Sequence, residues 1–190
     1  MRTRRCYLCK TKVPEQEAIM GQGQIKAFCC MDHLIEWSKS DKGKEAVKKA
    51  YKRETKEIKE KLKSRSDWLR EAQTAFNAYI RIRDKGKPCV SCGKPDDGSH
   101  QRHASHYRPS VNRAVTFNTY NVHASCAQCN TMKSGNLIPY RSHLVEMIGE
   151  EKVLWLESQN QPHSHDIEYL KRLKKIFAKK KRIYERYFRH

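Results

Sequence analysis

Two closely spaced pairs of cysteines constrain the fold of this chain more than any other feature. The pairs are Cys89-x2-Cys92 and Cys126-x2-Cys129, and 33 residues lie between them. Four thiolates in this arrangement meet the tetrahedral coordination that a structural zinc ion requires. We therefore expect residues 89–129 to fold around one zinc ion, with the cysteines contributing to folding and not to catalysis.

A second cluster of metal-ligand residue types lies near the N-terminus. Cys6 and Cys9 are followed, after a 19-residue spacer, by Cys29, Cys30 and His33. Cys6, Cys9, His33 and one of Cys29 or Cys30 would form a Cys3His zinc site. We favour Cys29, because one helical turn places its side chain on the same face as His33, and Cys30 stays open as the alternative. So short a segment needs a metal ion to fold by itself, which disfavours unligated thiols.

The charge of the chain indicates its class of partner. The 190 residues include 40 Lys and Arg but 21 Asp and Glu, which gives a formal net charge of +19. An excess of this size fits a polyanion, most simply nucleic acid. Charge alone does not separate a DNA enzyme from an RNA-binding assembly protein, so both stay open.

Cysteine usage and the lack of long apolar runs indicate the compartment. The segment Met1-Arg2-Thr3-Arg4-Arg5 does not resemble a secretory signal. No apolar run approaches the roughly 18 to 20 residues that cross a bilayer. Paired cysteines favour metal over disulfides where thiols stay reduced, so we expect a cytoplasmic protein without a membrane partner.

Hydrophobic periodicity predicts a mostly helical α+β fold. Residues Glu36 to about Arg83 repeat apolar positions at spacings of three and four, which predicts one long amphipathic helix. Two strands between the cysteine pairs and a helix that starts at Asn130, just after the second pair, are expected to form a zinc-bound ββα unit. Asp166 is expected to cap a final helix. The expected regions are an N-terminal zinc-binding segment at 1–36, a long basic helix at 37–84, the zinc-bound core at 85–149 and a basic helical region at 150–190.

The final expected helix carries a dense basic run, Lys179-Lys180-Lys181-Arg182. With its interleaved aromatic residues, this run suits contact with the phosphate backbone of DNA. A C-terminal bundle helix with a solvated basic face explains the segment equally well. Arg108 and Lys133 are the other residues that we predict to contact DNA.

Several short motifs carry a resemblance to known nucleases. They are Cys89-x2-Cys92, Ala104-Ser105-His106-Tyr107, Asn121-Val122-His123, Cys126-x2-Cys129-Asn130 and Gly135-Asn136, with Asn77–Asp84 preceding them. This pattern resembles the HNH or His-Me finger nucleases with a treble-clef zinc site. Nearly the whole chain, including the N-terminal cluster, resembles the phage lambda NinG family, also called Rap, most strongly from Ser66 to Gly149.

The resemblance implies a phage-encoded recombination endonuclease that cuts branched DNA, such as Holliday junctions and D-loops, in the bacterial host cell. It also implies a treble-clef HNH core. In that family Cys29 and His33 match the second pair of N-terminal ligand positions, of which the last is usually a cysteine. His33 is therefore a departure, and one that zinc tolerates.

The residues between the cysteine pairs suit metal-assisted phosphodiester hydrolysis. That reaction needs a base that activates water and a cation that neutralises charge on the phosphate oxygens. His106 is the candidate base, because a neutral imidazole accepts a proton near pH 7. Asn130 is the candidate ligand of a catalytic Mg²⁺ or Mn²⁺ ion, because a hard cation prefers oxygen donors. Asn121 is expected to fix the loop or to orient His106.

Ser105 departs from the pattern of many HNH enzymes, which place an Asp metal ligand immediately before the base. A catalytic ion would then be held by Asn130 and water alone, or by Asn130 with a neighbour such as His103. We expect His123 to serve in packing or phosphate contact and not in catalysis.

The sequence thus predicts a Mg²⁺-dependent endonuclease selective for branched double-stranded DNA, with two structural zinc ions. Because a four-way junction is symmetric, we also expect a homodimer. The main alternative is a non-catalytic zinc-finger protein that binds nucleic acid. That alternative needs the same cysteines and charge but has no use for His106.

Overall fold

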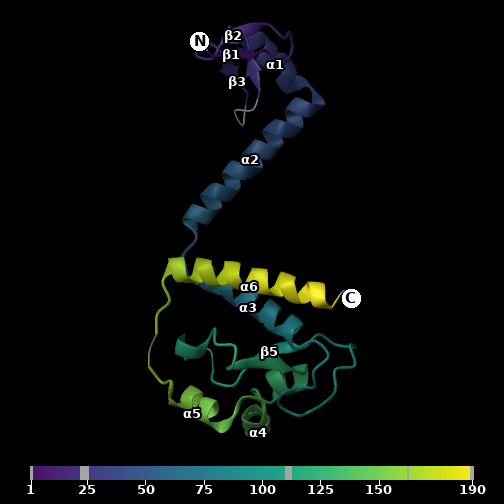
Figure 1. Ribbon diagram of the computed structural model, residues 1–190, viewed down its shortest axis with the longest axis vertical. Helices are drawn as coiled ribbons and strands as arrows, with labels where there is room; N and C mark the ends of the chain where they lie inside the picture. Colours follow the sequence, from purple (N-terminus) through teal and green to yellow (C-terminus); the bar gives the residue numbers. More distant parts are fainter. Residues whose placement is uncertain (1, 22–25, 110–112, 162, 189–190) are drawn as a thin grey trace. The chain divides into compact units, whose positions relative to one another are not determined.

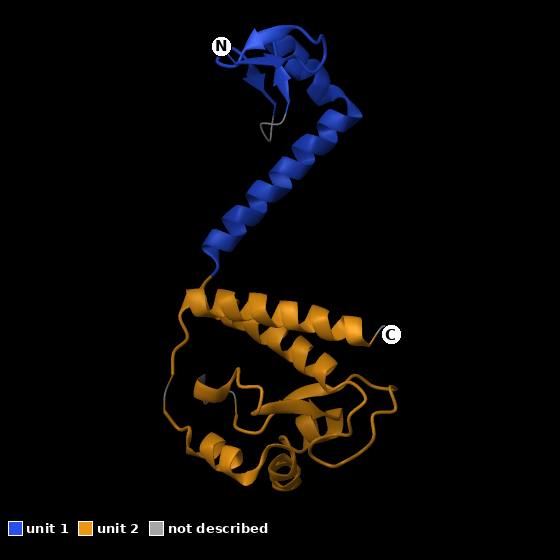
Figure 2. Cartoon of the chain, in the orientation of Figure 1, with its two compact units in different colours: residues 1–63 blue, residues 64–190 orange. Residues whose placement is uncertain are grey.

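The structure is a computed structural model that describes residues 2–21, 26–109, 113–161 and 163–188. Its chain divides into two compact units, residues 1–63 and residues 64–190 (Figure 2). The fold is mixed α/β and mostly helical, as the sequence predicts. The region expected at 37–84 is split between the two units. Within the described ranges, the helices are all too short or too polar to cross a membrane.

The first unit has a small core. Its buried apolar side chains are Cys6, Ala27, Phe28 and Trp37. So few buried groups contribute little folding free energy, which agrees with the expectation that metal stabilises this unit. Its elements are β1 (Thr3–Arg5) paired antiparallel with β2 (Lys12–Pro14), β3 (Ile19–Met20) paired antiparallel with β4 (Ala27–Phe28), α1 (Met31–Lys39) and α2 (Asp41–Leu62).

The single helix predicted from Glu36 to Arg83 was wrong, because serine caps divide this segment into three helices. The first break lies at Ser40, whose hydroxyl oxygen accepts a hydrogen bond from the Gly43 amide at 3.1 Å. This bond starts α2 in a new direction. Gly43 is required there, since a Cβ atom would lie 2.0 Å from the Trp37 carbonyl oxygen.

The second break lies at Ser64, which begins the second unit. The Ser64 hydroxyl accepts from the Asp67 amide at 3.2 Å, and the Asp67 carboxylate accepts from the Ser64 amide at 3.0 Å. This reciprocal pair is a capping box, which satisfies two amide groups at the start of α3 (Arg65–Arg83). The helix therefore begins here and does not continue from α2.

The second unit is a β-hairpin with helices on both faces (Figure 1). One face packs on α3 and α6, which lie side by side. The other face packs on α4 and α5. After α3 the elements are β5 (His103–His106) paired antiparallel with β6 (Val122–Ser125), the 3-10 turn Arg113–Val115, the π-helical turn Gln128–Met132, α4 (Leu137–Ile148), α5 (Glu150–Ser158) and α6 (Ile167–Tyr187).

Strand alternation assigns each hairpin side chain to one of these faces. The register of β5 and β6 is continuous, so even-numbered positions share one face and odd-numbered positions share the other. Val122 is buried with side chains of α3 and α6, whereas the rings of His123 and Tyr140 of α4 lie 6.4 Å apart. His106 therefore faces α3, and His103 faces the opposite side.

A buried carboxylate ties the end of α3 to the hairpin. Asp84 accepts hydrogen bonds from the Arg83 guanidinium at 2.6 Å, from the Lys87 ammonium at 3.1 Å and from the Ala124 amide at 3.1 Å. Burial opposes ionisation of Asp84, but the Arg83 guanidinium more than offsets this and lowers its pKa. The ionised carboxylate fixes the end of α3 to β6, the strand that pairs with the one carrying His106.

Candidate active site and metal centres

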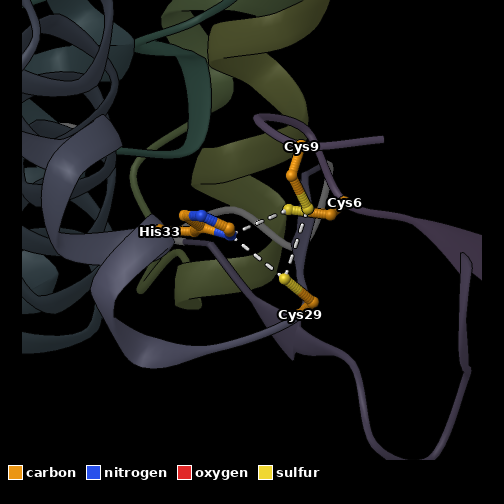
Figure 3. A group of neighbouring side chains, drawn as sticks. All are labelled: Cys6, Cys9, Cys29 and His33. Carbon is orange, nitrogen blue, oxygen red and sulfur yellow. Dashed lines mark hydrogen bonds between the residues drawn. The ribbon is translucent and has the colours of Figure 1, made fainter. Parts of the chain in front are cut away.

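Four predicted zinc ligands come together in the first unit (Figure 3). The ligand atoms of Cys6, Cys9, Cys29 and His33 all lie within 4.8 Å of one another. The Nδ1 atom of His33 is 3.0 Å from Sγ of Cys29 and 3.6 Å from Sγ of Cys6. Cys30 lies outside this group, with its Sγ atom 4.0 Å from that of Cys29. The structure therefore brings together the ligand set that contains Cys29.

Local backbone geometry prepares Cys6 as a thiolate ligand. The chain turns tightly after Cys6, since the Lys10 amide donates to the Cys6 carbonyl at 3.0 Å and Lys10 has a φ of 65°. Burial raises the pKa of the Cys6 thiol, but hydrogen bonds from the backbone of Cys9 and Cys29 bring it down to about 6. A low pKa favours the thiolate form that binds zinc.

The second group of predicted zinc ligands also converges. The sulfur atoms of Cys89, Cys92, Cys126 and Cys129 all lie within 4.8 Å of one another. The Cys126 amide donates to the Cys89 sulfur at 3.3 Å, and backbone hydrogen bonds of this kind outweigh burial and lower the pKa of Cys89 to about 7. All eight cysteines are free thiols. Both clusters therefore have the donor types and spacing that fit a structural zinc ion.

His106 is held by one ring nitrogen and leaves the other available. Its Nε2 atom lies 3.1 Å from the Thr116 carbonyl oxygen. Because a carbonyl oxygen only accepts, Nε2 carries the proton of the neutral ring and Nδ1 carries the lone pair. Among the described residues, Nδ1 has no hydrogen-bond partner. Burial keeps the pKa of His106 below its usual value of 6.5, so the ring is neutral at pH 7.

A polar cavity of about 570 Å³ lies between α3 and the His106 face of the hairpin. Gln73 and Asn77 of α3 line it, and Nε2 of Gln73 donates to Oδ1 of Asn77 at 2.8 Å, a bond that does not use the Asn77 amino group. The sequence motifs did not identify these α3 residues as neighbours of His106. The other side chains along the cavity wall are Ser66, Leu69, Arg70, Thr74, Ala104, Thr116 and His165.

Asn121 fixes the loop between the two strands and does not contact His106. Its fully buried carboxamide accepts from the Arg108 amide at 2.7 Å and donates to the carbonyl oxygens of Arg108 and Val115, each at 3.1 Å. Val115 precedes Thr116, whose carbonyl oxygen holds His106. Asn121 thus fixes the loop, one of the two roles that the sequence suggests, and is connected to His106 only through that loop.

The structure pairs Asn130 with His103 and separates it from His106. Nδ2 of Asn130 lies 3.2 Å from Nδ1 of His103. His103 and His106 stand at the two ends of β5 and on opposite faces, with about 10 Å of strand between them. His106, the base proposed from sequence, and Asn130, the proposed metal ligand, therefore do not lie together in one site. Alternation along β5 causes this separation, because residues three apart on one strand point to opposite faces.

The residues predicted to contact DNA differ in their availability. Lys133 is exposed after the π-helical turn. Arg108 is half-buried, and its guanidinium donates to the Asn160 carboxamide at 2.5 Å. Within the predicted basic run, Lys180 lies 5.6 Å from the ring centroids of Tyr79 and Phe177. The run as a whole is thus not a uniform phosphate-binding surface.

The other three members of that run, and His123, also have defined positions in the structure. Lys181 forms an ion pair with Glu185 at 3.1 Å, whereas Lys179 and Arg182 extend from α6 as exposed side chains. His123 is buried, with Nε2 lying 3.1 Å from the Tyr120 carbonyl oxygen. This position agrees with the packing role that we expect for His123.

Comparison with known proteins places the chain in one family. The family described as bacteriophage lambda NinG protein matches residues 1–186. Protein ninG of Escherichia phage 933W is 36% identical over 191 residues, which cover 93% of this chain and 91% of that protein. Protein ninG of Escherichia phage lambda is 44% identical over 120 residues, or 63% of this chain and 58% of the lambda protein.

The chain is also similar to a protein of a Salmonella phage. Protein ninG of Salmonella phage P22 is 42% identical over 120 residues, covering 63% of this chain and 58% of the P22 protein. No solved structure matches the chain significantly. These matches confirm the resemblance to the phage lambda NinG family. The chain belongs to the bacteriophage lambda NinG family.

Proposed function

We propose that this chain is an endonuclease that hydrolyses phosphodiester bonds in branched double-stranded DNA, with His106 as the general base. The observation that carries the proposal is the orientation of His106. The Thr116 carbonyl oxygen fixes the tautomer with its lone pair on Nδ1, and the ring lines an open pocket together with polar side chains of α3.

In the proposed reaction, Nδ1 of His106 takes a proton from the attacking water molecule. The Thr116 carbonyl oxygen keeps accepting from Nε2 and stabilises the charged ring that results. Arg70 lines the same cavity, and with the Asn77 amino group it provides donors for the phosphate oxygens. These groups come from α3, and the buried Asp84 cluster fixes that helix to the hairpin.

Asn130 and His103 are the candidate ligands of a divalent ion in the second unit. Asn130 and His103 offer one carboxamide oxygen and one imidazole nitrogen, a mixed set that suits Mn²⁺ better than Mg²⁺. Among the described residues, groups of three or more His, Cys, Asp or Glu ligands occur only in the two cysteine clusters. Because this pair lies across the hairpin from His106, we assign it no step in the hydrolysis.

Selectivity for branched DNA follows from the family resemblance and from the charge of +19. Phosphate contacts position a protein on DNA without specifying base sequence, so a basic surface suits recognition of shape. The HNH treble-clef classification belongs to the same proposal, supported by a hairpin followed by a helical turn beside four convergent cysteines. A dimer on the symmetric four-way junction is proposed on the same grounds.

Cleavage of a labelled four-way junction tests the proposal directly. Zinc-loaded protein is mixed with the junction, with a linear duplex of the same sequence and with an RNA competitor, in Mg²⁺, in Mn²⁺ and without added metal. We expect cleavage of the junction in preference to the duplex. Tight binding with no cleavage in either metal would favour the non-catalytic zinc-finger alternative, and preference for RNA would favour an RNA-binding function.

A further inference from the structure

We infer that one face of α6 contacts the phosphate backbone of duplex DNA through a row of five basic side chains. The row consists of Arg172, Lys175, Lys179, Arg182 and Arg186, all of which are exposed. The inference rests on the proposed function only for the choice of DNA as the polyanion. The row differs from the consecutive basic run at 179–182, because residues three and four apart, and not consecutive ones, share one face of a helix.

The spacing of the five residues places them on one stripe of the helix. They follow one another at intervals of three, four, three and four residues. At 3.6 residues per turn, their directions fall within an arc of about 80° and the row is about 21 Å long. The opposite face carries Leu170, Leu173 and Phe177, which are buried against the core. The row therefore points directly away from α3.

The charges of this row are not neutralised by neighbouring acids. Among the described residues, no carboxylate lies within ion-pair distance of the five, and only Arg172 has a recorded contact, at 5.6 Å from the Tyr169 ring. Several basic residues of α6 that lie outside this row, in contrast, form ion pairs with acidic residues. Lys171 pairs with Glu168 at 2.7 Å and Lys174 pairs with Glu71 at 2.7 Å. Acidic residues thus offset charge beside the row and leave the row itself cationic.

The row is also held rigid before any ligand binds. The Phe177 ring lies 4.7 Å from Phe76 and 5.5 Å from Tyr79 of α3, which fixes α6 along its length (Figure 1). A fixed helix loses little entropy on binding. Duplex DNA carries one phosphate about every 1.7 Å of its axis, both strands counted, so it presents phosphates along the whole of a row about 21 Å long. Duplex DNA therefore matches both the charge and the length of the row.

A matched pair of variants tests this surface by binding alone. One carries Lys175→Gln and Lys179→Gln, in the row, and the control carries Lys171→Gln and Lys174→Gln, beside it. Each variant loses two lysines from the same helix. Affinity for a four-way junction and for a linear duplex is measured from about 50 to 200 mM salt without added divalent ion, and thermal unfolding verifies the fold. Because cleavage is not measured, failure of the nuclease proposal does not affect the result.

The salt dependence gives the decisive quantity. If both lysines of the row contact phosphates, the slope of log K against log salt falls in magnitude by about 1.8 in the row variant. In the control variant this slope falls by less than half of that amount. Equal losses in the two variants, or no loss in the row variant, would overturn the inference. So would a row effect seen only with duplex RNA or with anionic lipid vesicles, since the ligand would then not be DNA.

Discussion

Nε2 of His106 donates to the Thr116 carbonyl oxygen at 3.1 Å, and this bond determines what the histidine can do. It assigns the proton of the neutral ring to Nε2 and leaves Nδ1 as the acceptor. The loop that carries Thr116 is fixed by the buried Asn121 carboxamide. A backbone carbonyl cannot rotate away as a side chain can, so the tautomer is set by the fold.

This geometry predicts the pH dependence of cleavage. Burial lowers the pKa of His106 below 6.5, and a general base acts in its neutral form. The single-turnover rate should therefore rise with pH along one ionisation below pH 6.5 and stay level from pH 7 upwards. Zinc content measured at each pH identifies any loss of the metal in acid. A rate that keeps rising between pH 7 and 8.5 would assign the base to another group.

Acid should destabilise the second unit through His123. Burial and the nearby Arg83 guanidinium lower the pKa of His123 from 6.5 to about 4 in the folded state. The folded state thus binds fewer protons than the unfolded state between these values. The stability that depends on neutral His123 is complete above pH 6.5 and is lost as the pH falls towards 4, by roughly 3 kcal/mol in total.

The variant His123→Gln isolates this effect, because glutamine does not titrate. We expect urea unfolding between pH 7 and pH 4.5 to show a smaller loss of free energy in the variant than in the unchanged protein. Acid loss of zinc is common to both proteins and cancels in the comparison. His100→Gln, at an exposed histidine, is the control. An identical pH dependence for His123→Gln and the unchanged protein would contradict the account.

The N-terminal ligand set predicts different zinc contents for two adjacent cysteines. Cys29 lies within the ligand group and Cys30 lies outside it. Cys30→Ser should therefore retain two zinc ions per chain in native mass spectrometry, and Cys29→Ser should retain one. The Cys29→Ser protein should also lose the folded first unit, which has a small core. Loss of zinc from the Cys30 variant alone would exchange the roles of the two residues.

The zinc ligands and the helix caps were accessible from sequence because they depend on local spacing. Cys-x2-Cys pairs and the four-residue interval between Cys29 and His33 bring donors together within one turn of chain. The break at Ser64 was equally local, since Ser64 and Asp67 form a capping box that the sequence displays. We overlooked it because the apolar repeat of the flanking helices continues across the break.

The relation between His106, His103 and Asn130 was not accessible in this way. Strand alternation alone puts His103 and His106 on opposite faces, but the contact of Asn130 with His103 and the helices that cover each face depend on tertiary packing. The cavity residues Gln73 and Asn77 left a weak indication, since they continue a polar stripe along α3 from Ser66 and Arg70. Only the packed structure connects that stripe to His106.

The rate at which a His106→Ala protein cuts a four-way junction tests the central claim most directly. The variant must retain two zinc ions and bind the junction within about twofold of the unchanged protein. The account predicts a fall in the single-turnover cleavage rate of about 10²- to 10⁴-fold, the range expected for loss of a general base. A folded, zinc-loaded variant that binds the junction and cuts it at the unchanged rate would contradict the account.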